Sequence, residues 1–134
     1  MSFDNRIKDF QNRGYEVPNH QMIKTPEQIA GIREAGRRNT MVLDYITPFV
    51  KEGVTTEELD RRIEEFTREM GCIPACLHYQ GYPKSVCISV DDVVCHGIPS
   101  ENQVLKSGDI VNVDCTTIYN GYYGDASRMF CIGD

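Results

Sequence analysis

The chain has 134 residues, of which 40% are hydrophobic and 25% charged, and its formal net charge of −6 corresponds to a pI near 5. This length suits one domain with a sizeable core, and an acidic balance without a basic stripe argues against a nucleic-acid partner. No apolar run approaches the ~20 residues that a membrane span needs, and the first residues lack the apolar stretch of a secretory signal, so we expect a cytoplasmic protein without membrane contact.

The first 21 residues are polar and are predicted to form an extension of the domain that follows. Within it, Phe3, Ile7 and Phe10 have the spacing of one short helical face. We expect this extension either to lie on the body or to stay mobile, and the compact domain to occupy residues 22–134.

Two amphipathic helices are predicted next. The first begins at Thr25, which can form a capping box with Gln28, and ends before Pro48. The second begins at Thr55 with another capping box and ends just before Gly71, a residue type that commonly follows a helix. Apolar side chains recur at helical spacing in both, at Ile29, Ile32, Ala35, Val42, Leu43 and Ile46 in the first and at Leu59, Ile63, Phe66 and Met70 in the second.

From Ile73 onward the hydrophobic spacing changes to that of β-strands. Residues 85–90 (SVCISV) alternate and are rich in β-branched types, and residues 93–98 (VVCHGI) form a second apolar run. Helices followed by strands predict an α+β fold, in which an antiparallel sheet is covered on one face by the two helices.

A hairpin is predicted over residues 109–131, because Asn120-Gly121 separates two strand-like runs. Both residues tolerate the positive φ of a type I′ turn. If Tyr119 pairs with Tyr122 next to the turn, the register of the whole hairpin follows.

This register places two aspartates on one face of the sheet. Asp125 lies opposite Thr116, and Asp114 is two residues farther along the same face. Carboxylates that lie close together in apolar surroundings repel each other unless they share a cation. We therefore predict that Asp114 and Asp125 bind metal; the alternative is a pair of aspartates satisfied by hydroxyls such as Thr116 or Ser127.

His96 is predicted at the end of the 93–98 strand, where Gly97 and Pro99 turn the backbone. A histidine presented there to a cleft can bind a ligand or donate a hydrogen bond near neutral pH. The alternative is a strand-end histidine that the local backbone satisfies.

Tyrosines and thiols are concentrated in the segment 76–87 (CLHYQGYPKSVC). Tyrosine rings and soft sulfurs suit a pocket for an apolar, polarisable side chain such as that of methionine, although an ordinary core would have the same composition. The candidate pocket residues are Cys76, Tyr79, Tyr82 and Cys87.

The six cysteines are predicted to be reduced and buried. A disulfide framework is typical of small secreted chains, and structural zinc at Cys72, Cys76 and His78 would lack a fourth ligand. The cysteines form no CxxC pair and fall mainly in apolar stretches, at Cys72, Cys76, Cys87, Cys95, Cys115 and Cys131.

Three motifs occur in order: GYPKSVCISVDDVVCHGIP at 81–99, GDIVNVD at 108–114 and GYYGDASRMF at 121–130. Together they make residues 22–134 resemble the bacterial-type methionine aminopeptidases, a branch of the pita-bread (creatinase/aminopeptidase) metallopeptidases. The resemblance implies the amino-terminal half of a pita-bread fold, whose second half would be absent from this sequence.

The resemblance also implies roles for the candidate residues. Asp114 and Asp125 match two ligands of a pair of divalent metal ions (cobalt, manganese, iron or zinc), with Asp125 bridging the two. His96 matches the histidine that contacts the substrate near the scissile peptide. The family's methionine pocket matches Cys76, Tyr79, Tyr82 and Cys87.

The implied reaction is hydrolytic removal of the N-terminal methionine from nascent proteins, preferring a small second residue. Metal ions would act as Lewis acids and a metal-bridging hydroxide as the nucleophile. The family's other ligands, one histidine and two glutamates, belong to the second half. We therefore expect a fragment that is inactive alone and pairs with the missing half or with a second copy through its exposed edge.

Two alternatives stay open on the sequence. One is a non-catalytic binding or assembly module that kept half of the pita-bread fold. The other is a related peptidase that acts on proline-containing substrates, which the tyrosine- and thiol-rich pocket disfavours.

Overall fold

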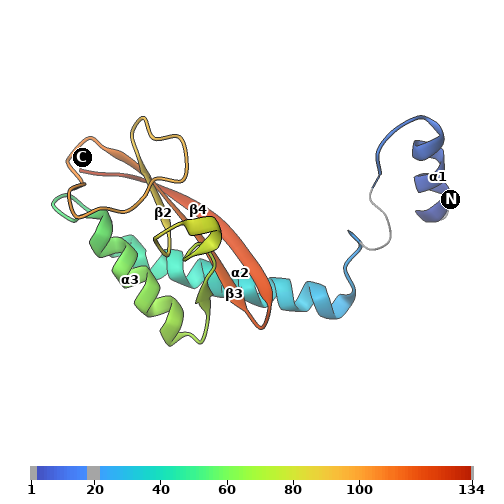
Figure 1. Cartoon of the computed structure of the whole chain (residues 1–134), viewed down its shortest axis with the longest axis horizontal. Helices are drawn as coiled ribbons and strands as arrows, with labels where there is room; N and C mark the ends of the chain where they lie inside the picture. Colours follow the sequence, from blue (N-terminus) through green and yellow to red (C-terminus); the bar gives the residue numbers. More distant parts are fainter. Residues whose placement is uncertain (1–2, 18–21, 134) are drawn as a thin grey trace.

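The computed structural model describes residues 3–17 and 22–133, and Figure 1 shows an antiparallel sheet with two long helices on one of its faces. This arrangement confirms the predicted α+β class. The elements in chain order are α1 (Phe3–Asn12), α2 (Pro26–Ile46), the 3-10 turn η2 (Thr47–Phe49), α3 (Thr56–Glu69), β1 (Ile73–Pro74), the 3-10 turn η3 (Tyr79–Gly81), β2 (Cys87–Val90), β3 (Ile110–Tyr119) and β4 (Tyr122–Cys131).

The predicted amino-terminal extension contains one short helix, α1. Its Phe10 ring meets the Tyr15 ring edge-on at 5.7 Å between centroids, and the Arg13 guanidinium lies over both rings at 5.4 Å. Residues 1–2, 18–21 and 134 lie outside the described residues. The predicted division of the chain into 1–21 and 22–134 therefore stays a prediction.

Helix α2 begins with the predicted capping box. The Thr25 hydroxyl accepts from the Gln28 N–H at 3.2 Å, and the Gln28 side chain accepts from the Thr25 N–H at 2.8 Å. The predicted apolar stripe is buried only from Ala35 onward, since Ile29 and Ile32 are 44% and 39% exposed. The sheet contacts α2 at Gly31, where the Tyr122 ring packs against the glycine. The first turn of α2 precedes this contact and extends past the sheet.

Helix α3 begins with half of the predicted capping box. The Thr55 hydroxyl accepts from the Glu58 N–H at 3.1 Å, but the Glu58 carboxylate binds Arg61 and Arg62 instead of returning to the cap. The helix ends as predicted, with Gly71 at a φ of 70° and the Cys72 N–H donating to the Thr67 carbonyl at 3.0 Å. This is the hydrogen-bond pattern of a Schellman motif.

The sheet is built around β3. Strand β4 pairs with one edge of β3, while β1 and β2 pair with different parts of the other edge, all antiparallel. The hairpin has the predicted register, with Tyr119 opposite Tyr122, and the predicted left-handed turn, with φ of 49° at Asn120 and 79° at Gly121.

The predicted strand over residues 93–98 is wrong, because this segment is a loop. Val94 is 94% exposed, and His96 has a φ of 55°, a left-handed conformation that interrupts an extended strand. The loop touches the sheet at Gly97, whose carbonyl accepts from the Ile88 N–H at 2.9 Å. An added Cβ at Gly97 would lie 2.0 Å from the Ile88 carbonyl oxygen, so only glycine fits there.

The core lies between the helices and the inner face of the sheet. Alternation along β3 sends Val111, Val113 and Cys115 into this core and leaves Asn112 and Asp114 on the outer face. The main fully buried side chains are Val42, Ile46, Leu59, Ile63, Val86, Ile88, Leu105, Val111 and Val113. The candidate site residues therefore lie on the side of the sheet away from α2 and α3.

All six cysteines are free, as predicted, but they are not all buried. Cys72, Cys87 and Cys115 are buried and Cys76 is half-buried, whereas Cys95 and Cys131 are exposed. Cys95 is in the loop that was expected to be a strand, and Cys131 is on the outer face at the end of β4. Among the described residues, no helix combines the length and the apolar character that a membrane crossing requires.

Candidate functional site

The two aspartates lie on the outer face of the sheet, in the predicted register. Asp114 on β3 is opposite Ser127 on β4 and Cys87 on β2, and Asp125 on β4 is opposite Thr116 on β3. The Thr116 hydroxyl donates to the Asp125 carboxylate at 2.9 Å. Thr116 therefore supplies one hydrogen bond to Asp125, and metal binding by the two aspartates stays a prediction.

Asp114 is half-buried and has no hydrogen-bond donor among the described residues. Its pKa is raised, first by burial and then by the negative charge of Asp125, while the nearby His96 lowers it. Both raising effects disfavour the ionised form, and a cation bound between the carboxylates would relieve both. The outer face at Asp114 thus has the electrostatic character of a cation site.

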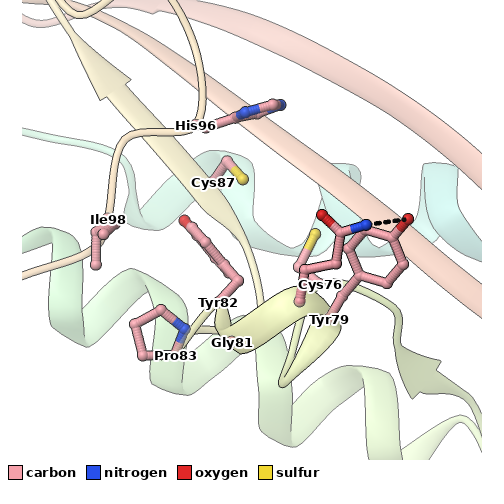
Figure 2. Close-up of a pocket in the computed structure, with 9 residues that line it drawn as sticks. Cys76, Tyr79, Gly81, Tyr82, Pro83, Cys87, His96 and Ile98 are labelled. Carbon is pink, nitrogen blue, oxygen red and sulfur yellow. Dashed lines mark hydrogen bonds between the residues drawn. The ribbon is translucent and has the colours of Figure 1, made fainter.

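A pocket of about 450 Å³ lies beside the aspartates, and Figure 2 shows the side chains that line it. Cys87 comes from β2, and His96 and Ile98 come from the loop after β2. The other lining residues belong to the segment between β1 and β2, namely Cys76, Tyr79, Gln80, Gly81, Tyr82 and Pro83. All five pocket and histidine residues predicted from the sequence therefore lie in one cavity.

A second hollow, of about 340 Å³, adjoins this pocket. It shares Cys76 and Tyr79 with the first pocket and is also lined by Thr116 and Tyr123. Thr116 is the residue whose hydroxyl holds Asp125. A ligand that filled both hollows would contact the apolar pocket at one end and Thr116, the hydrogen-bond partner of Asp125, at the other.

Tyr82 presents its ring, not its hydroxyl, to the pocket. The hydroxyl donates to the Gly97 carbonyl at 2.9 Å and approaches the Val86 carbonyl at 3.1 Å. Burial, followed by the neighbouring Cys87 thiol, raises the pKa of Tyr82. The tyrosine therefore stays neutral and offers an apolar wall.

The two pocket thiols influence each other. A hydrogen bond from Cys76, with further help from Tyr82 and His96, lowers the pKa of Cys87 to about 6 against the opposing effect of burial. The same hydrogen bond, followed by burial, raises the pKa of Cys76. Both sulfurs line the pocket and give it a soft, polarisable surface.

The loop under the pocket has an unusual backbone. His78 and Gln80 have φ of 67° and 49°, which is uncommon for residues other than glycine, and the Gln80 side chain donates to the Tyr79 hydroxyl at 3.4 Å. Such conformations persist when the surrounding structure determines them and are frequent at binding sites. The sequence prediction did not include Gln80 or Ile98 among the pocket residues.

Asn39 is the other residue that the sequence prediction missed. It lies on α2 with 0% exposure, donates to the Cys115 carbonyl at 2.9 Å and accepts from the Thr117 hydroxyl at 2.7 Å. These contacts hold β3 at the level of Asp114 and Thr116. A lone amide within an apolar helical stripe was the available signal.

Comparison with known proteins defines the class of the chain. The profile of metallopeptidase family M24 matches residues 30–134. The chain is 54% identical over 112 residues to the methionine aminopeptidase of Escherichia coli strain K12, a match that covers 83% of this chain and 42% of that protein. The chain therefore belongs to metallopeptidase family M24, and a divalent metal is implied.

Solved structures agree with this assignment. The methionine aminopeptidase from Rickettsia prowazekii superposes with a TM-score of 0.82 at 47% identity, covering 84% of this chain and 45% of that chain. The Xaa-Pro dipeptidase from Bacillus anthracis shares the fold, with a TM-score of 0.68 at 23% identity. These likenesses confirm the predicted pita-bread fold, and the chain spans less than half the length of the methionine aminopeptidases that it matches.

Proposed function

We propose that this chain takes part in removing the N-terminal methionine from nascent proteins, with preference for a small second residue. The observation that carries the proposal is the position of two carboxylates, Asp114 and Asp125, beside a pocket of tyrosines and thiols. An apolar, polarisable pocket suits the thioether side chain of methionine. The adjoining carboxylates would place a cation near the peptide bond that follows this side chain.

The metal-binding residues in this proposal are Asp114 and Asp125. Carboxylate oxygens suit divalent ions, and the half-buried Asp114 fits such an ion because it accepts no hydrogen bond from the described residues and His96 offsets its charge only in part. Two ions, drawn from cobalt, manganese, iron or zinc, would supply Lewis-acid activation of the scissile carbonyl when bound. Thr116 would orient Asp125 through the hydroxyl that already donates to it.

The remaining residues would bind and orient the substrate. His96 reaches the pocket from a loop and is exposed, so its ring is free to donate a hydrogen bond to the substrate near the scissile peptide. Cys76, Cys87 and the rings of Tyr79 and Tyr82 would surround the methionine side chain and exclude water from it.

The described residues provide only part of a metal centre. Among residues 3–17 and 22–133, no group of three or more histidine, cysteine, aspartate or glutamate side chains could hold a metal ion. We infer that Asp114 and Asp125 need ligands from another polypeptide segment, from a second copy, or from a longer protein that contains this sequence. The non-catalytic module predicted as an alternative also fits an incomplete centre, so the experiment must separate the two.

A chimera makes this separation. Residues 1–134 would be joined to the remaining part of the Escherichia coli methionine aminopeptidase, and methionine release from Met-Ala-Ser would be measured with added cobalt or manganese. We expect metal-dependent release by the chimera, loss of at least about a hundredfold with Asp125→Asn, and no release by the 134-residue chain alone.

The matched control is Asp92→Asn, which removes an exposed carboxylate from the turn after β2 and should leave release unchanged. A folded chimera without methionine release would reject the enzyme and favour the module. Release by the 134-residue chain that Asp125→Asn abolishes would show that no further ligands are needed. A cytoplasmic location without nucleic-acid or membrane partners agrees with nascent-protein substrates and stays a prediction.

A further inference from the structure

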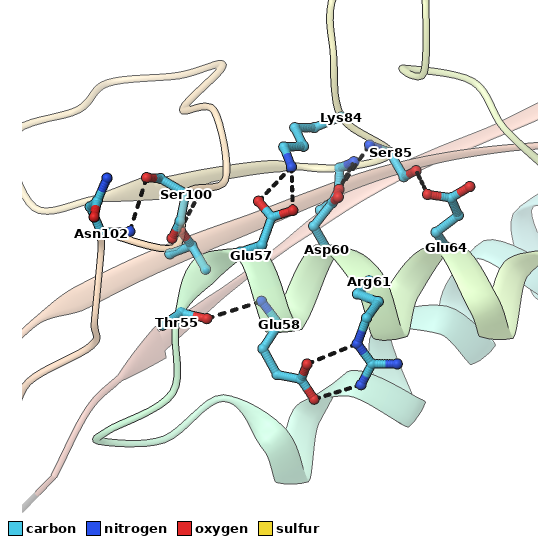
Figure 3. A network of polar contacts seen from close by, with 12 residues as sticks. Thr55, Glu57, Glu58, Asp60, Arg61, Glu64, Lys84, Ser85, Ser100 and Asn102 are labelled. Atoms are coloured by element: carbon cyan, nitrogen blue, oxygen red, sulfur yellow. Dashed lines mark hydrogen bonds and ion pairs between the residues drawn. The ribbon is translucent and has the colours of Figure 1, made fainter.

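Helix α3 presents three acidic side chains to the segment that leads into β2. Glu57, Asp60 and Glu64 are spaced so that they lie on one face of the helix, and Figure 3 shows them directed at Lys84 and Ser85. The segment they face, residues 84–86, connects Tyr82 and Pro83 of the pocket with Cys87. The sequence analysis identified the pocket residues on either side of this segment, Tyr82 and Cys87, but not the three acidic residues of α3 that hold it.

Each of the three carboxylates holds the segment by a different contact. Asp60 accepts from the backbone N–H groups of Ser85 and Val86 at 2.8 and 3.2 Å. Glu64 accepts from the Ser85 hydroxyl at 3.0 Å, and Glu57 forms an ion pair with Lys84. The segment is thus attached to α3 at three consecutive residues.

These contacts continue from α3 to the loop of His96. The Tyr82 hydroxyl lies within hydrogen-bond distance of both the Val86 and the Gly97 carbonyl oxygens. The Gly97 carbonyl also accepts a hydrogen bond from the Ile88 N–H at 2.9 Å. No side chain fits at Gly97, so the loop lies directly on β2. A shift of residues 85–86 would therefore move Tyr82 and the backbone next to His96 together.

Burial of the Asp60 carboxylate carries a desolvation cost. Asp60 is 5% exposed, and burial raises its pKa against the backbone hydrogen bonds and Lys84, which lower it. A buried carboxylate contributes less to stability than well-packed apolar residues of similar volume, whereas its directed hydrogen bonds define one geometry. This favours a positional role for Asp60.

We propose that Asp60, assisted by Glu57 and Glu64, is a positioning residue that sets the wall of the pocket: it holds residues 85–86 and, through Tyr82 and Gly97, the loop that carries His96. Its effect on catalysis rests on the proposed function. Its effect on the pocket does not, so the two are measured separately.

The pocket is tested in the 134-residue chain by iodoacetamide labelling and peptide mapping. Cys87, which is 7% exposed, reports opening of the pocket wall, and Cys115 in the core, which is 2% exposed, reports global opening. Asp60→Ala should raise Cys87 labelling relative to Cys115 by about tenfold. Asp60→Asn keeps an oxygen acceptor for both N–H groups, so its change should stay below about threefold.

The control for general destabilisation is Val42→Ala, which makes a cavity in the core at α2 and leaves the hydrogen bonds and the ion pair of residues 84–86 in place. It should raise Cys87 and Cys115 labelling by the same factor. The proposal would be overturned if Asp60→Ala raised the labelling of Cys87 and Cys115 by the same factor. It would also be overturned if Asp60→Asn raised Cys87 labelling as much as Asp60→Ala.

A milder pair of variants serves if Asp60→Ala does not fold. Glu64→Ala and Glu65→Ala each remove one exposed ion pair with an arginine of α3, but only Glu64 reaches Ser85. Selective Cys87 labelling should increase with Glu64→Ala and stay unchanged with Glu65→Ala. The same response from both would contradict the positioning role.

The catalytic consequence is measured in the chimera once wild-type turnover has been established. Asp60→Ala should raise KM for Met-Ala-Ser by about tenfold and change kcat by less than about threefold, because the pocket binds the methionine side chain in both ground state and transition state. Asp60→Asn should restore KM. A purely structural role predicts a loss of active protein with an unchanged KM. A chimera without turnover rejects the proposed function but leaves the labelling result intact.

Discussion

Removal of the Asn39 side chain should destabilise the chain severely, although Asn39 touches neither the pocket nor the carboxylates. Its amide joins α2 to β3 by donating to the Cys115 carbonyl and accepting from the Thr117 hydroxyl, at 2.9 and 2.7 Å. Asn39 is 0% and Thr117 1% exposed, so water cannot replace the lost partner without opening the structure.

The magnitude follows from these two contacts. A buried polar group that loses its partner costs about 1–3 kcal/mol, so the loss of both contacts in Asn39→Ala should reduce the free energy of unfolding by about 2–6 kcal/mol. This is a large part of the roughly 5–15 kcal/mol that stabilises a typical domain. In a double-mutant cycle, Asn39→Ala and Thr117→Val should show a coupling energy of about 1 kcal/mol, because they remove the two ends of one hydrogen bond.

Urea unfolding provides the assay, followed by far-UV circular dichroism or by the fluorescence of the seven tyrosines, since the chain has no tryptophan. Thr40→Ala is the matched control: Thr40 is the next residue of α2, it is exposed, and its hydroxyl donates only to the Gly36 carbonyl within the helix. The control should change stability by less than about 0.5 kcal/mol. If Asn39→Ala costs no more than Thr40→Ala, the buried amide does not hold β3 to α2.

Two further predictions concern the sheet–helix contact and pH. Gly124→Ala should reduce the free energy of unfolding by about 1–3 kcal/mol in urea or thermal unfolding, because the new Cβ would lie 2.4 Å from the Ala35 carbonyl oxygen. The control is Gly36→Ala, which has open space around it and should be neutral or stabilising. Equal losses of stability in the two variants would contradict the clash. The pKa of Asp60 in the folded chain is raised above its ordinary value of 3.8, so the folded chain binds a proton on Asp60 more tightly than the unfolded chain does. This proton binding stabilises the fold fully below pH 3.8, and the stabilisation is lost as the pH rises through the folded pKa. The stability of Asp60→Asn relative to wild type should therefore increase between about pH 3.5 and 7, and a difference that is constant with pH in urea titrations would refute the raised pKa.

Short-range features of this protein could be predicted from the sequence because the interacting residues are close neighbours in the chain. The capping box of Thr25 and Gln28 and the left-handed turn at Asn120-Gly121 depend on residues within one turn. The hairpin register then follows from the turn. With it follows the placement of Asp114 and Asp125 on one face, since side chains alternate along a strand.

The errors lie where a distant segment competes with a local pattern. Residues 93–98 have the composition of a strand, yet the close contact of Gly97 with Ile88 and the left-handed backbone at His96 make them a loop. Ile29 and Ile32 continue an apolar stripe, but they are exposed near the amino-terminal end of α2, on either side of the first contact with the sheet at Gly31. A local pattern indicates which face of an element is apolar, and it does not indicate how far the covering element reaches.

The sequence by itself thus determined the two helices, the hairpin, the family motifs and five of the nine residues that line the pocket. Only the tertiary structure decided how these parts hold one another: Asn39 reaches Cys115 across 76 positions of the chain, and Asp60 reaches Ser85 across 25. The physical reason is that a turn or a cap is stabilised by adjacent residues, whereas a buried amide or carboxylate is stabilised only by partners that the fold brings to it.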